Sequence, residues 1–458
     1  MKDPLVTVYV TNYNYGSYIE QAVESVLRQT FGGFELIIID DGSTDSSREI
    51  LRQYDNRPQI RLVFQENKGL NASNNVAVKM ARGRYVMRLD ADDYLDDNAL
   101  LVMTSVLEKD PAVALVFPDY YLVDKAGKVV GQERRHNFQT EVTLLDQPAH
   151  GACTMIRRDC LIEVNAYSEN FRCQDGYDLW LKIVDRYPVR NVNLPLFYYR
   201  QHGGNLTENQ ELILETRSQI LKVQANRMER PALRTVGVIP VLGPLADPRC
   251  LSLTALQGKP LLFWTIEAAL GAEGLDEVIV SSPDPELLAQ AAAAFPGRIT
   301  THLRPRSEGR ENVPYDSAVF DAIAHRRSAS EPQAVMLLTI ETPFRSSLYV
   351  DKAINVMRVF DVDVVLGVQA ESDLFFQHDG SGLKPLGNSS APGKLRFERD
   401  YLYRFSGGTA LVRRKFYEQN PTGIMTGRIG HFILSRQAAT TIRSPFDLAV
   451  ASAVLANN

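Results

Sequence analysis

The chain has 458 residues, of which 45% are hydrophobic and 23% are charged, and its formal net charge is -5. This length predicts two domains of ordinary size, and the composition is typical of a soluble globular protein. The net negative charge gives no electrostatic basis for a nucleic-acid partner. No apolar run approaches the roughly 20 residues that cross a membrane, and Met1-Lys2-Asp3-Pro4 contains no apolar signal segment. We therefore expect a cytoplasmic protein, and peripheral association with the inner face of the membrane stays open.

Strand and helix patterns alternate along the first half of the chain. Short apolar runs predict strands, and apolar residues at helical spacing predict helices between them. Ser17 and Glu20 form a capping-box pattern before the first helix. The expected elements are strands at 5–11, 34–39, 60–64 and 84–89, with helices after Ser17, from about Ser46, and at 71–81. This alternation predicts a mostly parallel sheet with helices on both faces.

Polar residues follow three of these strands. They are Asn12-Tyr13-Asn14, Asp40-Asp41 and Asp90-Ala91-Asp92. Ligands of such sheets bind beyond the carboxyl ends of the strands, so one crevice is expected to hold all three segments. Asp90 and Asp92 are two residues apart, which points both carboxylates the same way at a strand end and suits Mg²⁺ or Mn²⁺ bridging a diphosphate. The alternative is a solvated acidic turn in which an Asp caps the next helix.

The second half repeats an α/β pattern after a polar stretch. Residues 206–232 are helix-prone and predict a linker helix, although a last helix of the first domain explains them equally well. Further strands are expected at 235–242, 277–280, 334–338 and 362–368, with helices at 260–270 and 285–294. Residues 372–400 read as a long loop or hairpin. The four cysteines have no C-x-x-C spacing, so free thiols are expected at Cys153, Cys160, Cys173 and Cys250.

The first domain resembles the family 2 glycosyltransferases, which have the GT-A fold. The resemblance covers about residues 4–205 and rests on several short motifs in the family's order. They are Thr11-Asn12-Tyr13-Asn14, Ser25-Val26-Leu27-Arg28-Gln29-Thr30, Asp40-Asp41-Gly42-Ser43-Thr44-Asp45, Asn67-Lys68-Gly69-Leu70-Asn71, Asp90-Ala91-Asp92-Asp93, Gln174-Asp175-Gly176-Tyr177-Asp178-Leu179-Trp180 and Tyr199-Arg200-Gln201-His202. The resemblance implies a Rossmann-like nucleotide-diphospho-sugar transferase domain at 1–205.

The resemblance also implies roles for individual residues. Asp41 would accept hydrogen bonds from the base or ribose, Tyr13 would stack on the base, and Asp90 would meet the ribose. Asp92 and His202 would lie at the metal, which is Mn²⁺ or Mg²⁺. The remaining residues expected near the nucleotide sugar are Thr11, Asn14, Lys68, Asn71, Asn74 and Ala91. Helix capping is the alternative role for Asn71 and Asn74, and Lys68 is alternatively a solvated loop charge.

The expected reaction needs a base, because the acceptor hydroxyl must lose its proton as it attacks the sugar. Asp175 takes the place of the family's Glu-Asp pair, and Gln174 stands where the first acid usually lies. The resemblance therefore assigns the base to Asp175 and implies inversion at the anomeric carbon. Asp178 is expected to support the helix start, and His150 to lie on the acceptor side.

Residues 233–458 resemble the cytidylyltransferases that activate sialic-acid-type sugars, which implies a nucleotidyltransferase-like α/β domain. The segments that carry this resemblance are Val238-Ile239-Pro240, Gly258-Lys259-Pro260-Leu261, Trp264-Thr265-Ile266, Ser281-Ser282-Pro283-Asp284, Thr342-Pro343-Phe344-Arg345 and Ser444-Pro445-Phe446-Asp447. Leu242 and Ala246 stand at the family's basic phosphate-binding positions, Pro244 and Pro248 lack N–H donors, and Thr440-Thr441-Ile442-Arg443 offers no carboxylate for a metal. We expect a non-catalytic domain that serves dimerisation or binding.

Three hypotheses follow from these patterns. The first is a metal-dependent inverting glycosyltransferase that moves a sugar from a nucleotide diphosphate sugar, expected to be a UDP-sugar. Its acceptor would be a glycan, lipid-linked or protein hydroxyl, as in bacterial capsule, lipopolysaccharide or a glycosylated surface protein. The second is a bifunctional enzyme whose second half makes a CMP-sugar acid. The third is a non-catalytic scaffold in a glycan assembly complex.

Overall fold

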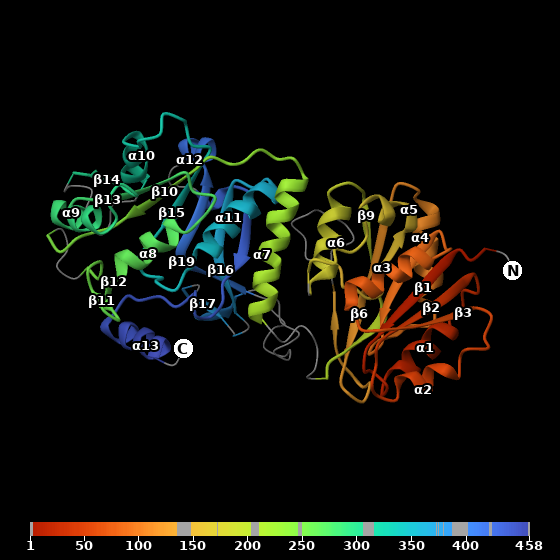
Figure 1. Cartoon of the computed structure of the whole chain (residues 1–458). Coiled ribbons are helices and arrows are strands. Elements are labelled where there is room, and N and C mark those ends of the chain that lie inside the picture. The colour runs from red at the N-terminus through yellow and green to blue at the C-terminus, as the bar shows by residue number, and fades with distance from the viewer. Residues whose placement is uncertain are drawn as a thin grey trace. The chain divides into compact units, whose positions relative to one another are not determined.

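The computed structural model describes residues 3–134, 148–171, 173–202, 210–245, 250–305, 316–371, 373, 375–378, 380–386, 402–420 and 424–456. These residues divide into two compact units, one up to Ile220 and one from Leu221 (Figure 1). The boundary falls within helix α7 (Gln210–Arg227), which occupies most of the stretch read as a linker helix. The domain limits at 205 and 233 stay predictions.

The first unit is built on one sheet, which has nine strands among the described residues, in the order β3-β2-β1-β4-β8-β6-β9-β5 with β7 paired to β6. The strands are β1 (Val6–Asn12), β2 (Phe34–Asp41), β3 (Ile60–Gln65), β4 (Tyr85–Asp90), β5 (Tyr94–Leu95), β6 (Leu115–Val123), β7 (Val129–Glu133), β8 (Met155–Arg157) and β9 (Val189–Arg200).

Half of this sheet is parallel and half is mixed. β3, β2, β1 and β4 run parallel, as the strand-helix alternation predicts. Beyond β4, however, β8 pairs antiparallel with both β4 and β6, and β5 pairs antiparallel with β9. The expectation of a mostly parallel sheet is therefore wrong for the second half. Its strands do not follow one another through regular helical crossovers, which parallel neighbours require.

Helices cover both faces of this sheet. They are α1 (Ile19–Leu27), α2 (Ser47–Arg52), α3 (Leu70–Met80), α4 (Ala99–Lys109), α5 (Arg158–Glu163) and α6 (Asp175–Val184). Leu36 and Ile38 of β2 share one core with side chains of α1 and α4. Ile37 and Ile39 are also fully buried, and they face the other side because side chains alternate along a strand. α3 packs on β1 and β2, so this is an α/β unit with a Rossmann-type sheet.

The first helix does not begin as the capping-box pattern predicts. α1 starts at Ile19, its cap residue is Tyr18, and no side chain caps the helix. Tyr18 N and Ile19 N both donate to Tyr15 O instead. This backbone turn places Tyr15 and Tyr18 at the helix entrance, beside the end of β1.

The strand register brings the polar segments together. Thr11 of β1 lies opposite Asp90 of β4, and Asn12 lies opposite Asp40 of β2. Because these strands are parallel, their carboxyl ends meet at the same edge of the sheet. The crevice expected from the sequence therefore has its residues in place at this edge.

The second unit has its own sheet, with seven strands among the described residues, in the order β14-β13-β10-β15-β19-β16-β20. The strands are β10 (Thr235–Pro240), β13 (Glu277–Ser282), β14 (Thr300–Leu303), β15 (Ala334–Leu338), β16 (Val364–Glu371), β19 (Leu402–Arg413) and β20 (Ile429–Ile433). Two small hairpins stand apart from it, β11 (Ala255–Leu256) with β12 (Lys259–Pro260) and β17 (Phe376–His378) with β18 (Leu383–Pro385).

Helices cover both faces of the second sheet as well. They are α8 (Leu261–Leu270), α9 (Pro285–Ala294), α10 (Asp316–Ala324), α11 (Ser347–Phe360), α12 (Arg414–Gln419) and α13 (Pro445–Ala456), with a short 3-10 helix η5 (Ile424–Thr426). Val319, Ala322 and Ile323 of α10 share a core with β10, β15, β16 and β19. α11 packs on β16, β19 and β20, and α8 packs on β10 and β13.

Two expectations from composition can be compared with the structure. All four cysteines are free, which confirms the prediction of free thiols. Within the described ranges, no helix has both the length and the apolar character to span a bilayer.

Gly83, between α3 and β4, tests the packing that aligns β4 with β1. A Cβ at this position would lie 2.4 Å from Thr7 N and 2.7 Å from Val6 C, which are backbone atoms of β1 that cannot move independently. Gly83→Ala is expected to lower the free energy of unfolding by about 1–3 kcal/mol, as overpacking does. Gly32→Ala is the matched control, because nothing lies within 4 Å of its Cβ, and its change should stay within about 0.5 kcal/mol. Chemical denaturation of both variants measures the difference, and equal stabilities would contradict this packing.

Candidate active site

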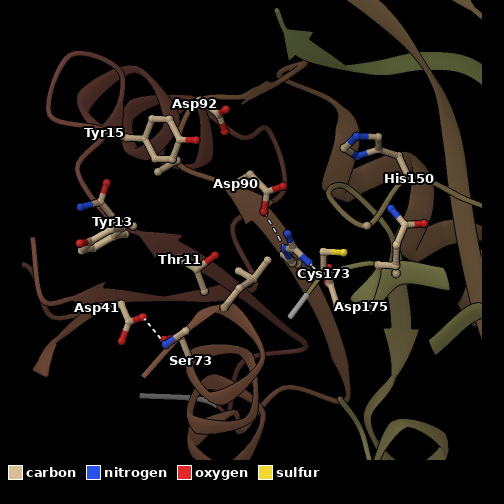
Figure 2. Close-up of a pocket in the computed structure, with 18 of the residues that line it drawn as sticks. Thr11, Tyr13, Tyr15, Asp41, Ser73, Asp90, Asp92, His150, Cys173 and Asp175 are labelled. Atoms are coloured by element: carbon tan, nitrogen blue, oxygen red, sulfur yellow. Dashed lines mark hydrogen bonds and ion pairs between the residues drawn. The ribbon is translucent and has the colours of Figure 1, made fainter. Parts of the chain in front are cut away.

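A cavity of about 1010 Å³ opens at the carboxyl edge of the first sheet (Figure 2). Its lining comes from the ends of β1, β2 and β4, from the start of α6, and from the segment before β8. The sequence-predicted residues in this lining are Thr11, Tyr13, Asn14, Asp41, Asp90, Ala91, Asp92, His150, Asp175 and His202. The structure thus gathers most of the predicted site around one cavity.

Arg88 connects two of the predicted carboxylates. Its Nε donates to Asp90 Oδ1 at 2.6 Å, and its Nη1 forms an ion pair with Asp175 Oδ2. The Arg88 side chain is 6% exposed, so its charge needs these partners. In Figure 2, Asp90 lies between Asp92 and Asp175, and the dashed line that starts at Asp90 marks its ion pair with Arg88. Arg88 therefore sets the positions of Asp90 and Asp175 relative to each other.

Asp92 pairs with His202. His202 Nε2 lies 2.9 Å from Asp92 Oδ2, and both side chains are largely buried. Burial raises the pKa of the Asp92 carboxyl, and the neighbouring Asp90 raises it further, whereas the hydrogen bond from His202 lowers it. Tyr18 stacks on the His202 ring and Tyr15 meets it edge-on. The predicted metal-site pair is therefore held together on one side of the cavity.

The turn after Asp92 is fixed by Arg200 at the end of β9. Arg200 Nε donates to Asp92 O at 2.8 Å, and Arg200 N donates to Asp93 Oδ1 at 2.9 Å. Burial raises the pKa of the Asp93 carboxyl well above its usual range, and Asp92 and Asp90 raise it further. The acidic run is thus no solvated turn, which was the alternative drawn from the sequence. The hydrogen bond from Arg200 to Asp92 O holds its backbone in place.

The two acids at the end of β2 have different surroundings. Asp40 is fully buried and accepts hydrogen bonds from Asn12 Nδ2 at 2.9 Å and Arg48 Nε at 2.8 Å. Asp41 lines the cavity and accepts from Lys68 N at 2.9 Å and Gly69 N at 2.8 Å. Asp40 therefore supports the turn, whereas Asp41 presents a carboxylate that orders the loop after β3.

The loop after β1 presents one exposed ring. The Tyr13 side chain is 48% exposed, while Thr11 is buried and Ala91 is fully buried beside it. Asn14 has a positive φ of 60°, and its Oδ1 accepts from Thr44 N at 2.8 Å. Asn14 thereby ties this loop to the loop after β2, and Tyr13 is left facing the cavity mouth.

Three residues predicted near the nucleotide do not line the cavity. Lys68 contributes its backbone N–H to Asp41, as described above. Asn71 Nδ2 donates to Ser168 O and Phe171 O, both at 2.8 Å, so this side chain anchors the segment that leads toward α6. Asn74 is fully buried on α3. Their proposed contacts to a nucleotide stay predictions.

Asp175 occupies the first turn of α6. The residue before it, Gln174, has a left-handed backbone (φ 61°), and its Oε1 accepts from Arg217 Nε of α7 at 2.6 Å. Such a conformation in a non-glycine residue marks a position that the surrounding structure determines. Asp178, in the same turn, is buried and pairs with Lys182 at 2.6 Å. Of these two acids, only Asp175 faces the cavity.

His150 lies against a cluster of aromatic rings. Tyr120, Phe197 and Tyr199 surround it, with the Tyr199 ring centroid at 4.7 Å. Its Nδ1 accepts from Ala152 N at 3.2 Å, so the ring is held in one orientation. β8 begins only at Met155, and His150 belongs to the segment before it.

Arg88, Tyr15 and Arg217 are among the lining side chains that sequence reasoning missed. Arg88 is a charged residue within the apolar run of β4, and that contrast was an available signal. Tyr15 lies close to the acidic run. Burial raises the pKa of its hydroxyl, and the Asp92 and Asp90 carboxylates raise it further. Arg217 comes from α7, and its guanidinium stacks over the Tyr177 ring. No local pattern in the sequence indicates that contact.

Comparison with known proteins identifies this domain. Residues 7–164 match the family model of glycosyl transferase family 2. The chondroitin synthase of Escherichia coli is 30% identical over 203 residues, which cover 44% of this chain and 30% of that protein. The hyaluronan synthase of Pasteurella multocida is 30% identical over 205 residues, which cover 44% of this chain and 21% of that protein. The chain thus spans less than a third of the length of these curated relatives.

Among solved structures, S. aureus TarS in complex with UDP-GlcNAc is 21% identical and has a TM-score of 0.43, covering 49% of this chain and 66% of that one. A likeness at this TM-score assigns no ligand. The family match, the sheet topology and the strand-end acids agree, and the first unit contains a family 2 glycosyltransferase domain. The prediction of this domain from the sequence motifs is confirmed.

Arg88→Met tests whether Arg88 holds the acidic groups of the cavity. The variant leaves Asp90 and Asp175 without their shared cation, so we expect a loss of about 3–5 kcal/mol in the free energy of unfolding. A chelator in the buffer prevents an added cation from compensating. Arg84→Met is the control, because the Arg84–Glu108 pair is exposed and should contribute less than about 1 kcal/mol. If Arg88→Met unfolds like Arg84→Met, the guanidinium does not hold the cavity together.

Proposed function

We propose that this protein is a metal-dependent, inverting glycosyltransferase that moves a sugar from a nucleotide diphosphate sugar to a hydroxyl group. The observation that carries the proposal is the grouping of Asp41, Asp90, Asp92 and Asp175 around one cavity of a family 2 domain. A nucleoside, a diphosphate with its cation, and an attacking hydroxyl would occupy different parts of this cavity.

The nucleoside would bind at the ends of β1 and β2. Tyr13 offers an exposed ring on which a base can stack, and Asp41 offers a carboxylate already oriented by Lys68 N and Gly69 N. Thr11 and Asp90 lie side by side in the register and would face the ribose. The expected uridine base rests on the family resemblance.

The residues present fit a divalent cation at Asp92 and His202. The Asp92 carboxylate is largely buried and lies near that of Asp90, which favours a positive ion between them and their surroundings. His202 Nε2 lies 2.9 Å from Asp92 Oδ2. Carboxylate and phosphate oxygens suit Mn²⁺ or Mg²⁺, and the His202 imidazole would add a nitrogen ligand beside them. When bound, the cation supplies positive charge that stabilises the leaving diphosphate. The Tyr15 hydroxyl stays protonated beside these acids and would donate to a phosphate oxygen.

Asp175 would remove the proton of the acceptor hydroxyl. Its Oδ2 is held by Arg88, so we assign proton uptake to Oδ1. The deprotonating hydroxyl oxygen forms its bond to the anomeric carbon as the bond from that carbon to the diphosphate breaks. One displacement of this kind inverts the configuration. Arg88 would orient the base and limit its movement, which maintains the geometry that proton transfer needs.

For the acceptor we propose a surface polysaccharide or a related glycan. The support is the relationship to proteins named as synthases of chondroitin and hyaluronan. His150 and Tyr199 line the same cavity as Asp175 and would contact a sugar ring, while the buried rings of Tyr120 and Phe197 support His150 from behind. The chain would act in the cytoplasm, at the membrane face where such glycans are assembled.

We propose a non-catalytic role, in dimerisation or binding, for the second unit. Asp284, the cap of α9, accepts from Leu245 N at 3.0 Å, so an N–H of the loop after β10 is bound to an internal carboxylate. A Cβ on Gly243 would lie 2.1 Å from Asp284 Oδ2, which shows how closely this loop packs against the acid. A phosphate would have to displace that anion. Ala246 and Pro248 lie outside the described residues.

Two alternatives have distinct outcomes. A bifunctional enzyme would release pyrophosphate from CTP in the presence of a nine-carbon sugar acid, and a chain that releases none across a panel of such acids excludes it. A scaffold with a vestigial first site would bind neither nucleotide nor Mn²⁺.

Asp175→Asn tests the proposed base. The amide cannot take the proton but still accepts a hydrogen bond from Arg88, so we expect kcat to fall about 10²–10⁴-fold while the melting temperature and the donor KM stay near their original values. Asp185→Asn is the matched control, since Asp185 is exposed at the other end of the same helix. Full activity of Asp175→Asn would assign the base elsewhere.

The donor and the metal can be tested in one screen. The full chain is incubated with a panel of nucleotide sugars and Mn²⁺, and the release of nucleoside diphosphate is measured with and without chelator. We expect one class of donor to be consumed, only with a divalent cation present, and Asp92→Ala to abolish the release. Asp97→Ala should leave it unchanged, because that carboxylate is exposed and pairs with Arg28. Release that is unaffected by both chelator and Asp92→Ala would refute the metal-dependent mechanism.

A further inference from the structure

The second unit contains a group of side chains that the proposed function does not use. His302, Asp321 and His325 each offer one ligand atom, and these atoms lie within 4.8 Å of one another. His302 belongs to the edge strand β14, while Asp321 lies on α10 and His325 follows the end of that helix. The group therefore links a strand to the helix that packs across the sheet.

The spacing within the group is close to that of a tetrahedral metal site. Bonds of about 2.0–2.1 Å to one ion place two ligand atoms about 3.3 Å apart. His302 Nε2 lies 3.1 Å from Asp321 Oδ2, so this pair needs almost no adjustment. The His325 ring centroid is 4.6 Å from that of His302. The His325 side chain is 58% exposed, so a small rotation can complete the site without disturbing the core.

Hydrogen bonds hold the rings of both histidines. His325 Nδ1 lies 2.8 Å from Asp321 O. A carbonyl only accepts, so Nδ1 carries the proton in this arrangement. The same nitrogen lies 3.8 Å from Asp321 Oδ1, so the exposed ring must turn away from Asp321 O to offer a ring nitrogen to the ion. His302 Nδ1 lies 3.0 Å from Ser281 Oγ, which is fully buried on β13. A second partner of this kind fixes the ring so that Nε2 faces Asp321, as in metal-binding histidines.

From this geometry we propose that His302, Asp321 and His325 form a Zn²⁺ site. Two imidazoles and one carboxylate suit Zn²⁺, whereas Mg²⁺ and Ca²⁺ prefer sites made of oxygen. Three protein ligands leave the fourth position for water or for a group of a bound molecule. Asp321 and His325 are both about half exposed, so that position faces solvent. The site is independent of the cation proposed at Asp92.

The site would also stabilise this part of the fold. β14 is an edge strand, held in the sheet only by its pairing with β13 among the described strands. A metal bound by His302 of β14, by Asp321 of α10 and by His325 just after α10 would connect the strand to the helix. Residues that bind the ion in the folded chain lose it on unfolding, so the ion adds to stability.

Metal titration of the full chain tests this proposal. The chain carries Asp92→Ala, so that the other cation site does not contribute, and is freed of metal with a chelator. Zn²⁺ is added, followed by Co²⁺ in a parallel sample for its visible absorption. We expect one tightly bound equivalent of Zn²⁺, a Co²⁺ spectrum of tetrahedral type, and a rise in melting temperature on Zn²⁺ addition.

Single substitutions separate ligands from neighbours. Ser281→Ala is expected to weaken Zn²⁺ binding about 10–100-fold, as the loss of a hydrogen bond to a ligand does, and His325→Ala to weaken it further. His378→Ala is the matched control, because His378 is exposed on β17 outside the group, and it should bind Zn²⁺ unchanged. Because His325 is exposed, its variant should fold, and circular dichroism checks this. No Zn²⁺ binding by the parent chain, or equal binding by His325→Ala and the parent, would mean that the three side chains only hydrogen-bond to one another.

Discussion

The buried guanidinium of Arg88 is the interaction on which the cavity of the first unit depends. It joins Asp90 at the end of β4 to Asp175 at the start of α6, and Arg88 itself is 87 positions from Asp175 in the chain. The guanidinium is almost fully buried and needs both carboxylates as partners, because ionised groups lose hydration on burial. The positive charge of Arg88, within the apolar strand β4, thus determines where Asp90 and Asp175 meet.

A second arginine secures the same region from the other direction. Arg200, at the end of β9, donates to Asp92 O through its guanidinium and to Asp93 through its backbone. Its charge also lies over the rings of Tyr18 and Tyr94. The acidic turn after β4 is therefore held between two buried arginines, and its remaining carboxylate, Asp92, faces His202 and the cavity. Such a preorganised set of charges is what transfer of a group with a charged leaving group requires.

The parts of this arrangement differ in how far the sequence predicts them. The ends of β1, β2 and β4 were predictable, because each strand is a short apolar run followed by polar residues and parallel strands end at one edge. Those three ends bring Thr11, Asp41 and Asp90 to one cavity. The mixed half was not predictable in the same way, since β8 is only three residues long and enters the sheet antiparallel. Contacts such as Arg217 with Gln174 depend on α7, which is distant in sequence and has no local signal for this partner. The amide of Asn71 shows the converse: a motif position near the cavity uses its side chain to anchor a distant loop.

The two units present different chemistry for cations. Four carboxylates and two imidazoles line the first cavity, whereas two imidazoles and one carboxylate gather on the second unit. In the first unit, the proposed cation and the nucleotide share a site, so each should strengthen binding of the other. Calorimetric titration of a panel of nucleoside diphosphates into the metal-free chain, with and without Mn²⁺, measures this coupling directly. We predict that Mn²⁺ tightens binding of one nucleotide by at least about fivefold, and that Asp92→Ala removes the effect. Affinities that are the same with and without Mn²⁺ for every nucleotide in the panel would contradict a shared site for cation and nucleotide.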